Sequence, residues 1–184
     1  MRRLCVVLLV ALFLFGCSKT YVDRGVELRN AFHGSKGVIF STEITADYGD
    51  KLYTFIVRCT TDKNGTLSFV VVEPTSIADI TGFVDETGGK ITFDDRVLAF
   101  PSLADDLITP VSAPWLFVRA IRSGCIKGSD SLPGGAYIMI EDSFRDNMFE
   151  VVVACDQAGV PNGGEIIWEG RRIITLEIED FAFL

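Results

Sequence analysis

The sequence predicts an α+β domain, mostly β, in which helices cover the concave face of a curved antiparallel sheet. Runs of alternating apolar and polar residues recur along most of the chain, and turn-forming residues separate them. One clearly amphipathic helix is expected late in the sequence, over residues 113–124. Runs of strands with a late helix are typical of α+β domains, and a sheet of roughly nine or ten strands is long enough to curl.

The first three strands of the domain, at residues 38–46, 52–59 and 67–72, are expected to form a meander of antiparallel strands. A helix over residues 20–32 precedes it and ends at His33-Gly34. The segment Asp62-Lys63-Asn64-Gly65 combines residues that favour a tight turn between two strands. The strands predicted here span residues 38–46, 52–59, 67–72, 80–84, 90–93 and 97–100, and a helical turn is expected at 103–107.

The late helix follows Ser112, a favourable N-cap residue, and has Pro114 in its first turn. Its aliphatic side chains recur at helical spacing, so this side is expected to face the sheet. Strands are then predicted over residues 136–141, 148–154, 165–168 and 172–179, and Glu169-Gly170 suits the turn between the last two. The apolar end, residues 181–184, is expected to be a last paired strand.

The N-terminus has the features of an export signal. Arg2 and Arg3 precede twelve apolar residues, and a small residue, Gly16, stands just before Cys17. Twelve residues are too few for a transmembrane helix, which needs about 20. The ending Leu14-Phe15-Gly16-Cys17 resembles a bacterial lipobox, which implies cleavage before Cys17 and diacylglycerol on its thiol. The alternative is an ordinary secretory signal with an incidental cysteine.

These features divide the chain into three expected parts: a lipoprotein signal peptide at 1–16, a tether with an N-terminal helix at 17–36, and one folded domain at 37–184. Without Arg2 and Arg3, the mature chain has 15 basic and 25 acidic residues and a net charge of −10. An acidic surface of this kind argues against nucleic acid as a partner. The expected location is the outer face of the cell membrane, reached through lipid on Cys17.

No pattern of residues predicts catalysis, a metal site or a cofactor. The single histidine, His33, follows a helix and has no nucleophile near it in the sequence. Phosphate-binding, zinc-protease and dinucleotide-binding motifs are absent from the sequence. Three cysteines remain besides Cys17 in the mature chain, and two of them, Cys59 and Cys155, have the spacing of buried strand residues. An internal or an intermolecular disulfide is an alternative for these thiols.

Trp115, Arg119 and Arg122 form the candidate partner contact. They share the side of the predicted helix opposite the aliphatic stripe, which would leave them exposed. Trp and Arg are enriched at interaction hot spots. In the alternative interpretation a loop covers Trp115 and nearby acids pair with the arginines.

The order of elements and several short phrases resemble the LolA-like superfamily, the outer-membrane lipoprotein-sorting fold. The closer resemblance is to lipobox-bearing LolA-like proteins of Gram-positive bacteria, which include spore-germination lipoproteins. It covers residues 35–184 and rests on Tyr53-Thr54-Phe55, Phe69–Pro74 with Ile77 and Ile80, Ile91–Asp95, Thr109–Pro114, Gly159-Val160-Pro161 and Trp168–Ile174. The resemblance implies an open half-barrel of about eleven strands around helices. Founding members carry lipoprotein acyl chains in that hollow.

Two functions are therefore expected for a domain that is not an enzyme. In the first, the lipid-anchored domain binds an apolar ligand or a lipidated or protein partner in its hollow, which needs an apolar slot on the order of a few hundred Å³. In the second, side chains fill the hollow and the domain is a scaffold for envelope or spore-associated protein contacts. A wall hydrolase is disfavoured, because no triad, metal cluster or acid pair is recognisable in the sequence.

Overall fold

A computed structural model describes residues 23–92, residue 104 and residues 108–184. Several sequence-based expectations fall outside these residues. They are the signal peptide, the lipidated Cys17, the strand at 97–100 and most of the helical turn at 103–107.

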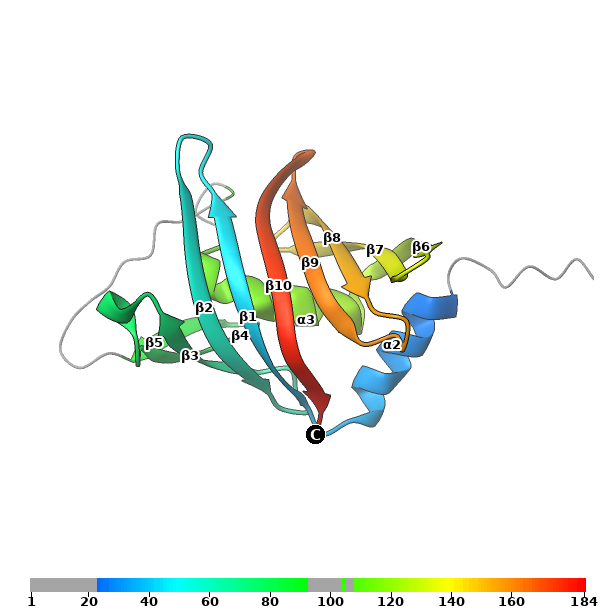
Figure 1. Ribbon diagram of the computed structural model, residues 1–184, viewed down its shortest axis with the longest axis horizontal. Coiled ribbons are helices and arrows are strands. Elements are labelled where there is room, and N and C mark those ends of the chain that lie inside the picture. The colour runs from blue at the N-terminus through cyan, green and yellow to red at the C-terminus, as the bar shows by residue number, and fades with distance from the viewer. Residues whose placement is uncertain (1–22, 93–103, 105–107) are drawn as a thin grey trace, which may run out of the picture.

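One antiparallel sheet of ten strands forms most of the described structure. Its spatial order is β5-β4-β3-β2-β1-β10-β9-β8-β7-β6, so the chain returns to pair its last strand with its first (Figure 1). The strands are β1 (Val38–Asp47), β2 (Leu52–Thr61), β3 (Leu67–Glu73), β4 (Thr81–Asp85), β5 (Gly88–Thr92), β6 (Cys125–Leu132), β7 (Gly135–Phe144), β8 (Asn147–Cys155), β9 (Pro161–Trp168) and β10 (Arg171–Phe183).

The sheet is open, because β5 and β6 lie at opposite ends of its strand order and do not pair. It curves around α3 (Ala113–Ser123), and α2 (Asp23–Gly34) packs beside α3 and against β6 and β7 (Figure 1). The predicted mostly β fold, with helices on the concave side, is therefore confirmed. Ten strands are described, fewer than the eleven or so that the resemblance implies. Two short 3₁₀ turns, η1 (Thr75–Ile77) and η2 (Pro110–Ser112), complete the described elements.

The largest differences between the strands and the sequence-based prediction lie in three places. No strand was expected where β6 forms, because its stretch Gly128-Ser129-Asp130-Ser131 is poor in strand-forming residues. β9 begins at Pro161, four residues earlier than predicted. The two strands predicted at 172–179 and 181–184 form a single strand, β10. It continues through an irregularity near Asp180, whose φ is +52°.

Turn chemistry agrees with the prediction at the β9–β10 hairpin. Glu169 and Gly170 both have positive φ, +51° and +76°. Positive φ at both central residues is the geometry of the type I′ turn, whose twist matches the flanking strands. The Asp62–Thr66 turn also forms as expected, because the Asp62 carboxylate accepts hydrogen bonds from the backbone N–H groups of Asn64 and Thr66.

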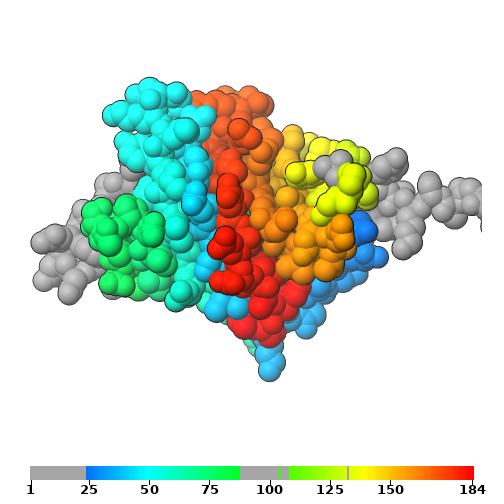
Figure 2. All heavy atoms as spheres, in the orientation of Figure 1, coloured from blue at the N-terminus to red at the C-terminus, as the bar shows by residue number. Residues whose placement is uncertain are grey.

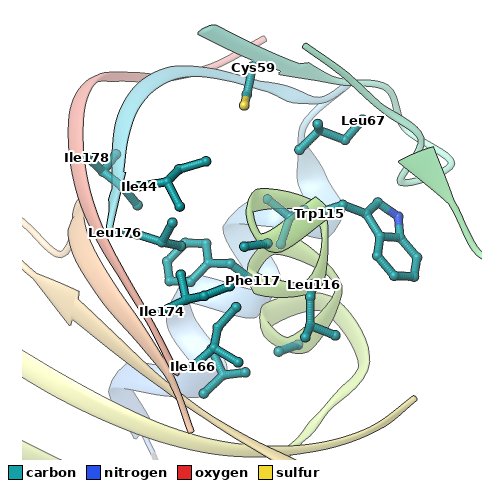
Figure 3. Packing of buried hydrophobic residues seen from close by; sticks show 14 of the residues in the cluster. Ile44, Cys59, Leu67, Trp115, Leu116, Phe117, Ile166, Ile174, Leu176 and Ile178 are labelled. Carbon is teal, nitrogen blue, oxygen red and sulfur yellow. The ribbon is translucent and has the colours of Figure 1, made fainter. Parts of the chain in front are cut away.

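The concave side is filled with apolar side chains. Strands β1, β2, β3, β7, β8 and β10 alternate buried and exposed residues, and the buried ones join those of α3 in a single cluster. Figure 3 shows Phe117 of α3 pointing towards Leu176 and Ile174 of β10 and Ile166 of β9. Five phenylalanines in this cluster are almost completely buried: Phe32, Phe40, Phe69, Phe117 and Phe149.

The convex side forms the outer surface, on which β1, β10 and β9 run across the middle of the molecule (Figure 2). Exposed side chains here include Glu43, Glu177 and Arg58. None of the helices in the described part of the chain is long and apolar enough to cross a membrane.

A groove between the second helix and two strand turns

A groove of about 470 Å³ runs beside the face of α3 that carries the predicted contact residues. Trp115, Arg119 and Arg122 all line it. The other wall comes from the β2–β3 turn at residues 64–66 and the β4–β5 turn at residues 85–87. The structure therefore brings together the three residues that the sequence singled out and adds two turns that are distant in the chain.

Arg119 is held in place by four groups. Its guanidinium forms an ion pair with the carboxylate of Asp142 and donates a 2.8 Å hydrogen bond to the carbonyl of Ser143. It also lies 5.8 Å from the ring centre of Trp115 and 5.6 Å from that of Phe144, within cation–π range. Arg119 thus ties α3 to the end of β7 and has little capacity left for a partner.

Asp142 is a buried carboxylate, 5% exposed. Burial raises its pKa above the ordinary value of 3.8, although the charge and hydrogen bond of Arg119 lower it. The cost of removing a carboxylate from water therefore exceeds the gain from its partner. The pair fixes the helix but is not a ready source of charge for binding.

Trp115 is buried, so the expectation that it is exposed was wrong. Its side chain is 3% exposed and packs edge-on against the ring of Phe144 at 5.3 Å. A helix on a flat sheet has one free side, but a curved sheet contacts its helix on several sides. Figure 3 shows Trp115 leaving α3 on the side away from Ile166 and Ile174. The ion pair at Arg119 and the burial of Trp115 both agree with the alternative interpretation in the sequence analysis.

On this face of α3, Arg122 is the cation that still has N–H donors available for a partner. It is half-buried, and one of its Nη atoms donates a 2.6 Å hydrogen bond to the carbonyl of Lys63 in the β2–β3 turn. A guanidinium has five N–H donors. No acidic partner of Arg122 appears among the described residues.

The C-terminal end of α3 is held by side chains of α2. Arg29 donates from Nε to the carbonyl of Ile121 at 2.8 Å and from an Nη atom to the carbonyl of Gly124. Nε2 of His33 lies 3.1 Å from the carbonyl of Arg122. The last carbonyls of a helix have no partner within the helix and carry partial negative charge, so a cation there is favourable. Through these bonds α2 fixes the position of Arg122.

The wall opposite Arg122 is acidic. Oδ1 of Asp85 accepts hydrogen bonds from the N–H and hydroxyl of Thr87, at 2.7 and 2.6 Å, and is therefore used within its own turn. Glu86 is exposed, and no ion pair or hydrogen bond to it is found within the part of the chain that the structure describes. The groove thus has a usable cation on the helix side and a usable carboxylate on the turn side.

A second pocket, of about 200 Å³, lies alongside α2. Apolar residues from four parts of the chain line it: Leu28, Ala31, Ile138, Val160 and Phe183. Arg24 and Glu27 provide its polar lining from α2. Its volume is smaller than that of typical small-molecule pockets, about 300–1,000 Å³.

The described residues offer no arrangement typical of catalysis. No group of three or more His, Cys, Asp or Glu side chains among them could hold a metal ion. Cys59, Cys125 and Cys155 are free thiols. Cys59 and Cys155 are buried as expected, and burial raises the pKa of both, that of Cys155 to about 11. Thiols of this kind stay protonated at neutral pH and are poor nucleophiles.

Sequence reasoning found the helix side of the groove and missed the turn side. The β2–β3 turn was predicted from its Asp, Asn and Gly residues, but a turn motif does not show which element its tip approaches. The β2–β3 and β4–β5 turns meet α3 only because the sheet curves, and this curvature depends on the whole set of strands.

The fold is similar to that of several solved structures. No protein-family model matches the chain, and no curated protein matches it in sequence. A LolA superfamily protein from Nitrosomonas europaea has 10% identity and a TM-score of 0.48, with 91% of this chain and 94% of that one covered. A putative outer-membrane lipoprotein-sorting protein domain from Vibrio parahaemolyticus has 12% identity and a TM-score of 0.40, with 88% and 91% covered.

A further similar structure is that of MucB, with 11% identity and a TM-score of 0.43. The similarity covers 86% of this chain and 58% of MucB, which has also been solved in complex with MucA(peri). All three identities are below 25% and all three TM-scores below 0.5. The function of this chain therefore has to be argued from its own residues.

Proposed function

We propose that this chain is an extracytoplasmic lipoprotein of the Gram-positive LolA-like type, anchored through Cys17, whose folded domain binds a protein partner and catalyses no reaction. The observation that supports partner binding is the contrast between the concavity and the groove. The described part of the concavity is packed with α3 and buried phenylalanines. The groove beside α3 is accessible and lined mostly by polar residue types, which come from α2, α3 and the β2–β3 and β4–β5 turns.

The anchor is proposed from the sequence alone. The basic start, the short apolar run and the lipobox-like Leu14-Phe15-Gly16-Cys17 support export and lipidation. Diacylglycerol with a further acyl chain would hold the protein stably on the outer face of the cell membrane, because one chain binds only marginally. The resemblance to spore-germination lipoproteins supports a role in a Gram-positive envelope or spore.

Binding of an apolar ligand is the second candidate, favoured by the apolar pocket beside α2. Its volume of about 200 Å³ would admit a small apolar group rather than a whole lipid. Native mass spectrometry of the mildly purified protein separates the two candidates. Apart from the covalent lipid on Cys17, we expect no bound lipid, and one non-covalently bound acyl compound in stoichiometric amount would favour the second candidate instead.

Two experiments test the proposal. Metabolic labelling with a fatty acid should mark the full chain, and Cys17→Ala should abolish both the label and the retention in the membrane pellet. For the groove, the anchored chain is cross-linked in its native envelope, and the partner is identified and quantified. Arg122→Glu should abolish that cross-link, whereas the matched Arg58→Glu on the exposed outer face of β2 should keep it. Equal cross-linking by both variants would contradict a partner site in the groove.

A further inference from the structure

We infer that the groove receives an extended segment of the partner that carries one acidic and one basic side chain. This inference rests on the proposed function and specifies the chemistry of the partner. The acidic side chain would meet Arg122 on α3, and the basic one would meet Glu86 in the β4–β5 turn. Both residues line the same groove, on walls from different elements.

The charges available on the two walls support this assignment. Asp142 neutralises Arg119, and the carboxylate of Asp85 accepts hydrogen bonds from its own turn. Arg122 and Glu86 are left without a charged partner among the described residues. Ion pairs with a ligand that carries both signs would satisfy both groups, whereas a ligand of one sign would meet a like charge on one wall.

The uncharged lining favours a peptide chain over a compact anion. Asn64, Thr66, Thr87 and Ser123 offer amide and hydroxyl groups between the charged walls. The hydroxyls of Thr87 and Ser123 donate within the chain, to Asp85 and to the carbonyl of Arg119, so they can only accept from N–H groups of a partner. Asn64 and Thr66 can also donate to carbonyls, and an extended backbone presents both kinds of group. The volume of about 470 Å³ lies within the range of ligand pockets, about 300–1,000 Å³, and an extended segment would need only part of its length inside.

The position of Arg122 is set before any partner arrives. Lys63 fixes its guanidinium from the β2–β3 turn, and α2 fixes the end of the helix through Arg29 and His33. A charged side chain that is already positioned loses less conformational freedom on binding. Arg122 therefore suits recognition of a carboxylate by a bidentate pair of N–H donors.

The test uses synthetic octapeptides of Gly and Ser that carry one Glu and one Lys, separated by one to four residues. Control peptides carry two Glu, two Lys or two Gln at the same positions. Binding to the folded chain is followed by NMR through the indole N–H signals of its two tryptophans. Trp115 lines the groove, and Trp168 lies by the β9–β10 turn, so Trp168 is an internal control.

We expect at least one mixed-charge peptide to shift the Trp115 signal and leave that of Trp168 in place. Arg122→Glu and Glu86→Arg should each weaken this binding about threefold or more, in keeping with the loss of an exposed charge pair and its replacement by repulsion. The double variant restores two opposite charges and should recover binding. This recovery distinguishes ion pairing from a loss of folding.

Three results would overturn the inference: an acidic or basic control peptide that binds as tightly as the mixed ones, no shift with any mixed peptide, or a double variant no better than the single ones. If the peptides fail while Arg122→Glu still abolishes the native cross-link, the protein-binding function stands and only this description of the partner is wrong. If the cross-link also survives, the groove itself is not the site.

Discussion

The ring of Phe117 on α3 packs directly onto the backbone of Gly164 on β9. A Cβ atom on residue 164 would lie 2.9 Å from Cδ2 of Phe117 and closer still to Cε2. Real Cβ atoms essentially never approach other atoms below 3.0 Å. The absence of a side chain at residue 164 therefore sets how closely α3 approaches the sheet, and the helix in turn positions one wall of the groove.

Gly164→Ala should lower the free energy of unfolding by about 1–3 kcal/mol, the usual cost of adding a methyl group to a well-packed core. Urea denaturation followed by tryptophan fluorescence measures the change. Phe117→Leu in the same background should recover part of the loss, because it removes the ring that the new methyl group meets. Gly134→Ala is the matched control, since a Cβ there has no atom within 4 Å. Equal effects at both glycines would contradict this account.

Glu43 on β1 and Glu177 on β10 stand directly opposite each other on the outer face of the sheet. Like charges in directly opposite positions destabilise an antiparallel pair. Glu177→Lys should therefore raise the free energy of unfolding by about 0.2–1 kcal/mol, and high salt should reduce the gain. Glu179→Lys, opposite Ser41, makes the same change in net charge and should stabilise less. If both variants gain equally, the effect comes from net charge alone.

Much of the fold follows from local patterns, and the deviations have physical causes. Alternation identified β10, in which Ile174, Leu176 and Ile178 are buried and the residues between them are not. It missed β6, a strand at the end of the sheet whose Gly, Ser and Asp residues carry almost no strand signal. The contact of Phe117 with Gly164 joins positions 47 residues apart in the chain. No pattern within either segment reports this contact.

The candidate site was predictable to a similar degree. Helical spacing correctly placed Trp115, Arg119 and Arg122 on one side of the helix, and this side does line a groove. Spacing could not show that Phe144 and Asp142, from the end of β7, would meet that side and bury the tryptophan. Periodicity reports the face of a helix, whereas the exposure of that face depends on the curvature of the sheet around it.

The three described thiols should react at very different rates. Cys125 is exposed, whereas Cys59 and Cys155 are buried and held protonated. Because the thiolate is the reactive form, iodoacetamide at about pH 8 should label Cys125 in the folded domain and spare the other two. Mass spectrometry of tryptic peptides measures each site, with the urea-unfolded chain as the reference in which all three are labelled. Fast labelling of Cys59 in native protein would contradict its burial.

Arg29 should contribute substantially to stability, although it lies on the N-terminal helix. Its two hydrogen bonds satisfy carbonyls at the end of α3, and bonds to charged groups contribute about 1.5–3 kcal/mol. Arg29→Ala should lower the free energy of unfolding by about that amount. The neighbouring Asn30→Ala, an exposed site on the same helix, is the control and should change it little. NMR signals of residues 121–124 should shift only in the Arg29 variant.

Asp142 should make stability depend on pH in an unusual direction. Burial raises its pKa above 3.8 in the folded domain, so the folded state holds the proton more tightly than the unfolded chain does. The stabilisation from Asp142 is then fully present below about pH 3.8 and is lost as the pH rises through the folded pKa.

Asp142→Asn removes the titrating group and keeps an acceptor for Arg119. The free energy of unfolding of the parent chain minus that of the variant should therefore fall as the pH rises from about 3.8 through the folded pKa of Asp142, and level off above it. Urea denaturation at several pH values measures this difference. Ser143→Ala keeps the carboxylate of Asp142. The difference in free energy of unfolding between the parent chain and this variant should therefore stay constant with pH. A difference for Asp142→Asn that grows with pH would instead show that Arg119 outweighs burial and lowers the pKa of Asp142.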